Sequence, residues 1–387
     1  MEDIKRVQLS EIVELITKGT TPTTLGYEFQ DEGVNFLKIE CFDENGGFIE
    51  SKVAHISEEC HKKMKRSQLK NGDILFSIAG AIGRVAIVTE EMLPANINQA
   101  LAIIRISDGQ VYLPYIKLIL TSPIVIEQFE RKKQGVAQLN LSLKDINEIS
   151  IPLPSKDKQI EFAELFDKVV GVISKRNKEL SALDDLIKAR FVELFGDPVS
   201  NTMNWPVKKL KELSIQINSG NTPKGGSENY VKKGIVFFRS QNVWKDRLEM
   251  EDIAYIDVQT HESMKRSSLK HGDILMTKTG RINTENSSLG RAALYMGEDD
   301  KANVNGHVYF IRLKPEVNKK FVLRILVSDE YRNLIRSVCV GGIDKRQLNK
   351  EHIEDFPIIC PTEDMVNKYI AFVDQVDKSK VAVLKIF

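Results

Sequence analysis

Short apolar runs bounded by glycine alternate along the chain with stretches of helical spacing. The segments "GDILFSIAG" (72–80), "RVAIVTE" (84–90) and "QALAIIRI" (99–106) have the length and turn residues typical of β-strands. Residues 113–132, "LPYIKLILTSPIVIEQFERK", carry apolar residues at helical spacing and predict a helix. The first part of the chain is therefore expected to be a mixed unit of helices and strands.

The same pattern occurs a second time. "MKRSQLKNGDILFSIAG", beginning at Met64, and "MKRSSLKHGDILMTKTG", beginning at Met264, share eleven of seventeen positions. The match extends upstream at an offset of 201 ("ITKGTTP" against "INSGNTP") and downstream at an offset of 207. The change of offset places an insertion of about seven residues between Gly280 and Gly290.

Two long copies indicate two similar domains, because a solenoid needs at least three repeats of about 20–50 residues. The predicted fold class is α+β, with two similar mixed α/β domains at 1–153 and 199–360. A long spacer helix is expected within 154–198, because the stretch from Pro154 to Phe195 has no further proline and ends at "FGDP", and a second helix over 361–387 repeats its register.

Apolar residues at heptad steps form a seam on both helices. A helix packed on its own domain is the alternative, but the first helix would be about 60 Å long, more than one small domain covers. We therefore expect the helices to pair as long antiparallel coiled-coil spacers, with further helices of partners docking on the seams. The predicted spacer and partner-binding residues are Phe162, Phe166, Val169, Ile173, Leu180, Leu183, Ile187, Tyr369, Val373, Val376 and Val383.

Charge gives no direct indication of a nucleic-acid partner. The chain has 55 basic and 54 acidic residues and a formal net charge of +1. Nucleic-acid binding would therefore depend on a local basic face, or on partner chains that supply part of the attraction. The charged N-terminus and the absence of an apolar run near the ~20 residues of a membrane span predict a cytoplasmic protein.

The sequence contains no nucleotide-binding, hydrolase or metalloprotease motif, and its four cysteines lack metal-site spacing. Asp73 and Asp273 precede strands, where an aspartate usually accepts hydrogen bonds from turn amides. The repeats keep these framework residues and differ in neighbouring polar segments. Those of the second copy are rich in Arg, Lys, Asn, Gln and Thr, which bind base edges and phosphates.

The doubled order of "GTTP"/"GNTP", "LKNGDIL"/"LKHGDIL", "IPLP" and "FVELFGDP" resembles the specificity (S) subunit of type I restriction-modification systems. The resemblance covers essentially the whole chain, although the second helix lacks a counterpart of Ser181 to Pro198. It implies two target-recognition domains, each reading half of an asymmetric bipartite site in double-stranded DNA. It also implies that this chain has no activity or cofactor of its own.

The partners implied by the resemblance are two modification subunits, which methylate adenine from S-adenosylmethionine. Restriction subunits, where present, use ATP and Mg. The predicted DNA-binding residues are Lys38, Ser77, Arg84, Gln138 and Asn140 in the first domain and Arg239, Gln241, Asn242, Lys278, Thr279, Arg281, Asn283, Lys345 and Arg346 in the second. Two alternatives stay open, a tandem scaffold for a non-nucleic-acid partner and a metal-dependent nuclease using Asp73 or Asp273.

Overall fold

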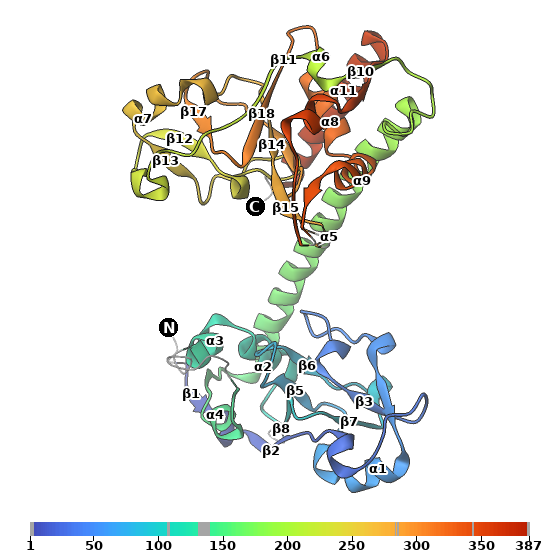
Figure 1. Ribbon diagram of the computed structural model, residues 1–387. Helices are drawn as coiled ribbons and strands as arrows, with labels where there is room; N and C mark the ends of the chain where they lie inside the picture. The colour runs from blue at the N-terminus through green and yellow to red at the C-terminus, as the bar shows by residue number, and fades with distance from the viewer. Residues whose placement is uncertain are drawn as a thin grey trace. The chain divides into compact units, whose positions relative to one another are not determined.

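The computed structural model of the chain describes residues 4–106, 109–130, 140–282, 284, 286–342 and 344–384. The chain divides into two units, Met1–Ser174 and Lys175–Phe387, and the division falls within a long helix. Each unit is a mixed structure of sheets and short helices with its own hydrophobic core (Figure 1).

Unit 1 is built on two sheets. The four-stranded sheet is antiparallel, in the order β2 (Val13–Lys18), β8 (Leu101–Ile106), β5 (Ile74–Ser77), β6 (Val85–Ile87). The three-stranded sheet has the order β4 (Ala54–Ile56), β3 (Val34–Leu37), β7 (Ala95–Ile97), and β3 pairs parallel to β7. The three strands predicted from the glycine-bounded apolar runs are thus confirmed as β5, β6 and β8.

The remaining elements of unit 1 cover these sheets. They are the pair β1 (Arg6–Gln8) and β9 (Ser150–Pro152), and the helices α1 (Glu58–Lys63), α2 (Leu113–Leu120), α3 (Pro123–Glu130) and α4 (Leu143–Asn147). The helical spacing read over 113–132 corresponds to two helices rather than one, because α2 ends at Leu120 and α3 begins at Pro123. Proline has no N–H to continue the ladder of the preceding turn, so the chain restarts there.

Unit 2 repeats these sheets in the same order. The sheets are β11 (Ser214–Ser219), β18 (Val308–Leu313), β14 (Ile274–Thr277), β16 (Ala292–Leu294); β13 (Ala254–Ile256), β12 (Ile235–Phe238), β17 (Ala302–Val304); and β10 (Val207–Lys209), β21 (Pro357–Ile359). Its short helices are α6 (Leu210–Leu213), α7 (Val258–Ser263), α8 (Lys319–Leu326), α9 (Asp329–Val338) and α10 (Lys350–Glu354). The sequence repeat is therefore a structural repeat.

Unit 2 has a further small sheet. It consists of β15 (Thr279–Arg281), β20 (Lys345–Gln347) and β19 (Val340–Gly341). The first of these strands lies next to the insertion that distinguishes the two copies.

A buried ion pair explains why "GDIL" occurs in both copies. The Asp73 carboxylate accepts two hydrogen bonds of 2.7 Å from the Arg105 guanidinium and one of 2.8 Å from the Lys70 amide. In unit 2, Arg312 donates to Asp273 at 3.0 and 2.7 Å. Both aspartates are buried, so their oxygens are committed to holding the turn before the strand against the neighbouring strand.

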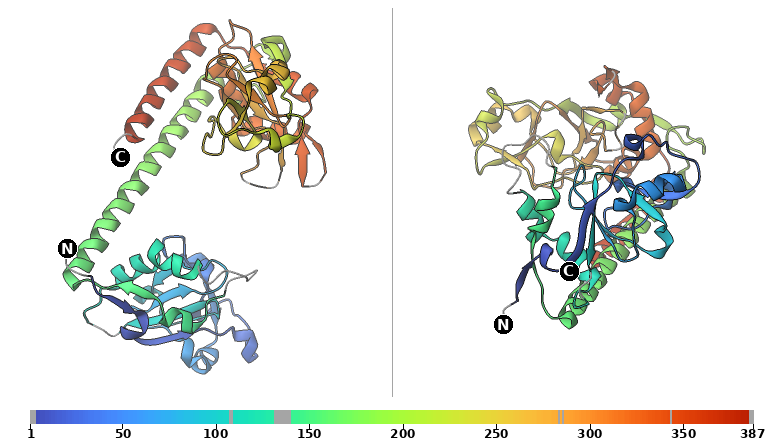
Figure 2. Two further views of the ribbon diagram at one scale, coloured as in Figure 1. Left: turned by 90° about the vertical axis from the view of Figure 1, so that its left-hand side faces the viewer. Right: turned by 90° about the horizontal axis from the view of Figure 1, so that it is seen from below.

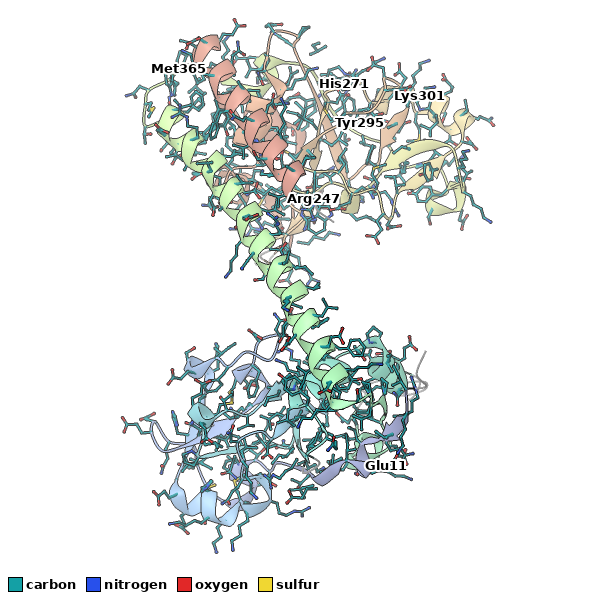
Figure 3. All side chains as sticks on the ribbon, turned by 180° about the vertical axis from the view of Figure 1, so that it is seen from behind. Glu11, Arg247, His271, Tyr295, Lys301 and Met365 are labelled. Carbon is teal, nitrogen blue, oxygen red and sulfur yellow. The ribbon has the colours of Figure 1, made fainter. Side chains whose placement is uncertain are left out.

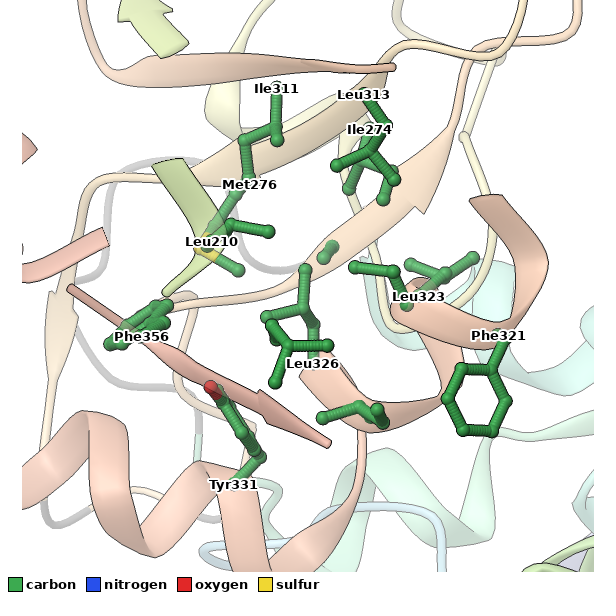
Figure 4. Close-up of a cluster of buried hydrophobic side chains, with 14 of the residues drawn as sticks. Leu210, Ile274, Met276, Ile311, Leu313, Phe321, Leu323, Leu326, Tyr331 and Phe356 are labelled. Carbon is green, nitrogen blue, oxygen red and sulfur yellow. The ribbon is translucent and has the colours of Figure 1, made fainter. Parts of the chain in front are cut away.

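The core of unit 2 lies between its four-stranded sheet and helix α8 (Figure 4). Ile274, Met276 and Ile311 point from the sheet toward Leu323 and Leu326 on the helix, and all five side chains are buried. Burial of branched aliphatic side chains on one face of a sheet is what fixes the strand register.

The long helix α5 runs over Lys156–Phe195, and α11 runs over Glu363–Leu384. Gly196 adopts a left-handed φ of 71°, the conformation that commonly ends a helix. Within unit 2, Tyr369 Oη donates to the Ile187 carbonyl at 3.5 Å, and Lys380 Nζ lies 2.5 Å from Asp184 Oδ1. Higher numbers on α11 meet lower numbers on α5, so the helices are antiparallel (Figure 2), which confirms the fold class.

The helix pairing differs from a heptad seam in two respects. In unit 2 the buried residues of α5 are Ile187, Phe191 and Phe195, at four-residue steps, because the two rings pack on Phe321 of α8 as well as on Tyr369 of α11. Leu180 and Leu183 are partly exposed, as is Val383. The pairing is also shorter than predicted, since the predicted seam residues Phe162, Phe166, Val169 and Ile173 are exposed in the described structure.

The aromatic cluster should dominate the attachment of α5 to unit 2. The Phe191 ring centroid lies 5.2 to 5.8 Å from those of Phe195, Phe321 and Tyr369. We expect Phe191→Ala to lower the free energy of unfolding of unit 2 by about 3–5 kcal/mol, because it leaves a cavity. Urea denaturation measures this, with the exposed neighbour Val192→Ala as control. Equal midpoints for the two variants would contradict the packing.

Candidate nucleic-acid interface

The small sheet of unit 2 places two predicted DNA-binding segments side by side. Strand β15 pairs antiparallel with β20, with Arg281 opposite Lys345 and Thr279 opposite Gln347. Residues directly opposite each other on antiparallel strands point to the same face, as do residues two apart on one strand. Thr279, Arg281, Lys345 and Gln347 therefore share one face, although 66 positions separate the centres of the two strands.

This face is unusual in its charge. Like charges directly opposite each other destabilise a strand pair. Arg281 and Lys345 are both exposed, and among the described residues no carboxylate forms an ion pair with either. Such an arrangement is stabilised when a phosphate, or the O6 and N7 acceptors of a guanine, approaches it. Thr279 and Gln347 add neutral hydrogen-bonding groups to the same face.

Two glycines allow this sheet to form. A Cβ on Gly280 would lie 2.2 Å from the Leu289 backbone nitrogen, so a larger residue would displace the returning insertion. Gly341 has a φ of +133°, a backbone conformation that residues with a Cβ rarely adopt. The sheet is joined to the domain by Lys278, whose amide donates to the His307 carbonyl at 2.8 Å and whose carbonyl accepts from the Leu348 amide at 2.9 Å.

Arg346 lies on the opposite face of this sheet. Its register partners are Gly280 and Gly341, which leave space beside its side chain. Its Nε is buried and has no hydrogen-bond partner among the described residues. A buried donor without an acceptor costs free energy, so this nitrogen favours an acceptor that the described residues do not supply.

A stacked Arg–Trp–Arg group lies at the base of the insertion. The Arg291 and Arg247 guanidinium carbons lie 3.8 and 5.3 Å from the Trp244 ring centroid (Arg247 is labelled in Figure 3). Arg291 Nε donates to the Ser287 carbonyl at 3.0 Å, and its guanidinium also bonds the Asn286 carbonyl. Burial lowers the pKa of Arg291, and the cations of Arg332 and Arg247 lower it further.

Arg291 therefore holds the insertion against unit 2. We expect Arg291→Ala to reduce discrimination at one half-site about tenfold without preventing folding, because β15 loses its support while its side chains remain. Competition binding with variant duplexes measures the discrimination. Arg291→Lys should restore little of it, since an ammonium cannot reproduce the fork to two carbonyls and the stacking. Full discrimination in Arg291→Ala would show that the insertion needs no such support.

Three other predicted residues of unit 2 form a separate cluster at the end of β12, in a different sheet (Figure 1). Arg239 forms an ion pair of 3.1 Å with Asp252, and Gln241 donates to the same carboxylate at 2.9 Å. The hydrogen bond from Gln241 and the cation of Arg239 lower the pKa of Asp252. Asn242 is buried. Its Oδ1 accepts from the Arg239 backbone amide, and its Nδ2 donates to the Glu249 and Asp252 carbonyls, so its side chain has a role within the fold.

In unit 1 the predicted residues are more dispersed. Lys38 Nζ lies 4.9 Å from the Phe29 ring centroid, and Arg84 donates to the Phe42 carbonyl at 3.5 Å. Ser77 is buried and bonds the Ala79 carbonyl, so its hydroxyl is not on the surface. Asn140 is exposed. Gln138 of this unit and Asn283 of unit 2 lie outside the described residues.

Each unit contains the same backbone hydrogen bond at this position of the repeat. The Leu141 amide donates to the Ile78 carbonyl at 3.0 Å, as the Leu348 amide does to Lys278. Asn140 therefore occupies the position of Gln347. Gln347 and its register partner Val340 were not among the predicted DNA-binding residues. Nothing in the comparison of the two copies distinguished either residue from its neighbours.

Part of the chain is similar to proteins of known family. Residues 1–182 match the family of the type I restriction modification DNA specificity domain. The chain is 30% identical over 171 residues to the type I restriction enzyme EcoBI specificity subunit of Escherichia coli. The first part of the chain is thus similar to this specificity family. Unit 2, beyond the matched residues, repeats the sheet order of unit 1.

The similarity to curated members of the type I specificity family is partial. The EcoBI match covers 42% of this chain and 35% of that subunit. A putative type I restriction enzyme specificity subunit, MjaX of Methanocaldococcus jannaschii, is 25% identical over 62% of this chain and 60% of its own length. The matches thus span about a third to three fifths of these relatives.

Two solved structures share the fold over nearly the full length. A chain described under complex assembly and conformational transition of the type I R-M system has a TM-score of 0.58 at 16% identity, covering 99% of this chain and 92% of that one. The S subunit of a type I system from M. genitalium has a TM-score of 0.51 at 14% identity, covering 100% and 95%. The TM-scores show a shared fold, and at these low identities the likeness extends no further than the fold.

Two further observations concern membrane-spanning helices and the metal-dependent nuclease that the sequence left open. Among the described residues, no helix combines the length and apolar character needed to cross a membrane. Asp73 and Asp273, the carboxylates that a metal-dependent nuclease would require, are each bound by an arginine and a turn amide. The nuclease alternative is therefore not favoured.

Proposed function

We propose that this chain is the specificity subunit of a type I restriction-modification system and reads an asymmetric bipartite site in double-stranded DNA. In this proposal residues 1–153 and 199–360 are the two target-recognition domains, and 154–198 and 361–387 are the spacer helices. The family match supports the class of protein, and the repeat of sheets supports two recognition domains.

The observation that carries the proposal is the exposed face of β15 and β20. Arg and Lys pair with guanine O6 and N7 in the major groove, and Gln pairs with adenine N6 and N7. Arg281, Lys345 and Gln347 provide these groups on adjacent strands of one rigid element. These groups lie on the β15–β20 pair at one edge of the three-stranded sheet, and a pair of strands is narrow enough to enter the major groove, which is about 12 Å wide.

The differences between the copies support two unlike half-sites. Unit 1 has no insertion at the position of β15, and where unit 2 has "TKTGRINTENSSLGR" it has "SIAGAIGR". Different side chains on the same framework present different donors and acceptors to a base pair. Both units are attached to one continuous helix, α5, so the proposal requires a constant gap between the half-sites.

The proposal assigns chemistry to partners rather than to this chain. Two modification subunits would supply S-adenosylmethionine and methylate adenine, and restriction subunits would supply ATP and Mg. They would also contribute to the attraction for DNA, which suits a chain with a net charge of +1. The curated relatives are named specificity subunits, which supports a non-catalytic role. We place the complex in the cytoplasm, where it meets DNA.

Selection of bound duplexes from a random library tests this function. The chain is assembled with its modification subunit, and the bound DNA is sequenced. We expect two different short motifs separated by a constant number of unconstrained base pairs. Enrichment of no motif, or binding to a non-nucleic-acid partner with no dependence on DNA, would favour the tandem scaffold instead.

A further inference from the structure

The turn 244–247 of unit 2 contains a residue in an uncommon conformation. Asp246 has a left-handed φ of 64°, which few residues other than glycine adopt, although aspartate and asparagine tolerate it. The Trp244 amide donates to the Arg247 carbonyl at 2.9 Å and closes the turn. The Asp246 amide donates to the Ala292 carbonyl at 2.8 Å, so the turn lies against β16, the strand that follows the insertion.

The Asp246 carboxylate holds this turn on helix α8. It accepts a hydrogen bond of 2.6 Å from Arg324, whose side chain is only 16% exposed. The same guanidinium lies 3.6 Å from Asp377 of α11. Asp377 pairs with Lys380 at 3.2 Å, and Lys380 also pairs with Asp184 of α5. A charge-assisted hydrogen bond to a mostly buried guanidinium is screened little by salt, so it restrains the turn relative to the helix pair.

The internal repeat shows that this arrangement is particular to unit 2. The position that corresponds to Asp246 in unit 1 is Gly46, which has a φ of 76°. A Cβ on Gly46 would lie 3.2 Å from Nζ of Lys117, the twin of Arg324 at an offset of 207. Unit 1 thus has the same turn beside the same helix position, without the carboxylate. The other two charged positions are also apolar there, with Val170 in place of Asp377 and Ile173 in place of Lys380.

The turn also carries the residue on which the insertion rests. The Arg291 guanidinium carbon lies 3.8 Å from the Trp244 ring centroid, and Arg291 Nε donates to the Ser287 carbonyl within the insertion. Trp244 Nε1 donates to the Gln241 carbonyl at 3.0 Å, which fixes the ring. A displacement of the turn would therefore move Trp244, and with it the support of β15.

We propose that Asp246 is a positioning residue for half-site recognition by unit 2. Its ion pair with Arg324 fixes the turn to α8, the turn places Trp244 against Arg291, and Arg291 holds the insertion that carries β15. This inference rests on the proposed function, and it adds that discrimination by unit 2 depends on a carboxylate that contacts no base. Unit 1, with Gly46, recognises its half-site without this restraint.

Tryptophan fluorescence of the full chain tests whether the ion pair holds the turn. The chain has two tryptophans, so a Trp205→Phe background leaves Trp244 as the only one. We expect Asp246→Asn to raise acrylamide quenching of Trp244 about twofold, because asparagine tolerates the left-handed φ but the turn loses its attachment to α8. Circular dichroism melting of each variant separates a displaced turn from a lost fold.

Competition binding in the assembled complex tests the effect on recognition. We expect Asp246→Asn to reduce discrimination at the unit 2 half-site about tenfold and to leave that of unit 1 unchanged. Arg324→Gln should have the same effect and the double variant no larger one, because each single change already breaks the pair. Asp355→Asn is the matched control and should alter neither measurement, since it removes a carboxylate of the same unit that pairs with Lys209 and Lys211.

Unchanged quenching of Trp244 in Asp246→Asn would overturn the inference. Altered quenching with full discrimination at the unit 2 half-site would also overturn it, as would additive effects of the two changes in the double variant. An unaltered complex that prefers no half-site would refute the proposed function and this inference together. A half-site preference that Asp246→Asn leaves intact would refute this inference alone.

Discussion

The double variant Arg281→Ala and Lys345→Ala is expected to lose recognition of one half-site and to keep the other. The two side chains share one face of the β15–β20 ribbon, and each bidentate contact to a base is worth about 1–3 kcal/mol of discrimination. Their joint loss should reduce the preference for the cognate half-site roughly 100-fold. Competition between the cognate duplex and duplexes altered in either half measures this in the assembled complex.

Lys232→Ala with Lys233→Ala is the matched control, because it removes the same charge from exposed positions of the same unit. The salt dependence separates bases from phosphates. Each lost phosphate contact reduces the slope of log K against log salt by about 1, whereas a lost base contact leaves it nearly unchanged. If both double variants retained equal discrimination, the ribbon would not be the reading surface.

The second large effect is expected from Asp273→Asn. This buried carboxylate accepts from Arg312 at 3.0 and 2.7 Å and from the Lys270 amide at 2.8 Å. Removing one partner of a buried ion pair leaves the other uncompensated and costs about 3–5 kcal/mol. For a unit of this size we expect the melting midpoint to fall by roughly 10 °C. Differential scanning calorimetry measures the transition.

Asp257→Asn in the same unit is the control for this change. Asp257 is the N-cap of α7 and accepts from the Thr260 amide at 2.6 Å, and asparagine caps helices about as well. The twin substitution Asp73→Asn should destabilise unit 1 by a similar amount. A midpoint for Asp273→Asn equal to that of Asp257→Asn would show that the repeated ion pair does not support the fold.

Much of the architecture followed from one chain compared with itself. The two copies share the residues that build the turns and the buried ion pair, so self-comparison identified two domains, whereas the glycine-bounded apolar runs identified the strands β5, β6 and β8. The start of α5 after Pro154 and its end before Gly196 depended on local chemistry of proline and glycine, which a single sequence displays. Pro123 carried the same kind of signal, but the apolar spacing on both sides of it concealed the break.

The candidate interface could be predicted only in part. Lys278, Arg281 and Lys345 were identified because the copies differ there, but nothing local indicates that β15 and β20 pair. Long-range strand pairing depends on the returning chain, and here on Gly280, which a residue with a Cβ could not replace. Asn242 and Ser77 were predicted for their polarity, whereas burial of their side chains depends on the three-dimensional packing.

The helix pairing shows a similar limit. A heptad pattern indicates that apolar residues share one face of a helix, but it does not indicate which element covers that face. Phe191 and Phe195 are buried because α8 adds a third surface with Phe321, which the spacing on α5 alone does not reveal. For the same reason Phe162 and Phe166 satisfy the pattern and are exposed.

Two similar units on one helix are expected to read two different half-sites. Methylome sequencing tests it most directly, in cells that carry the chain with its modification subunit and, in parallel, a chain whose residues 200–360 come from a relative of different specificity. We expect a split adenine motif with a constant gap, of which the exchange alters one half only. Alteration of both halves, or a methylated motif without a gap, would contradict it.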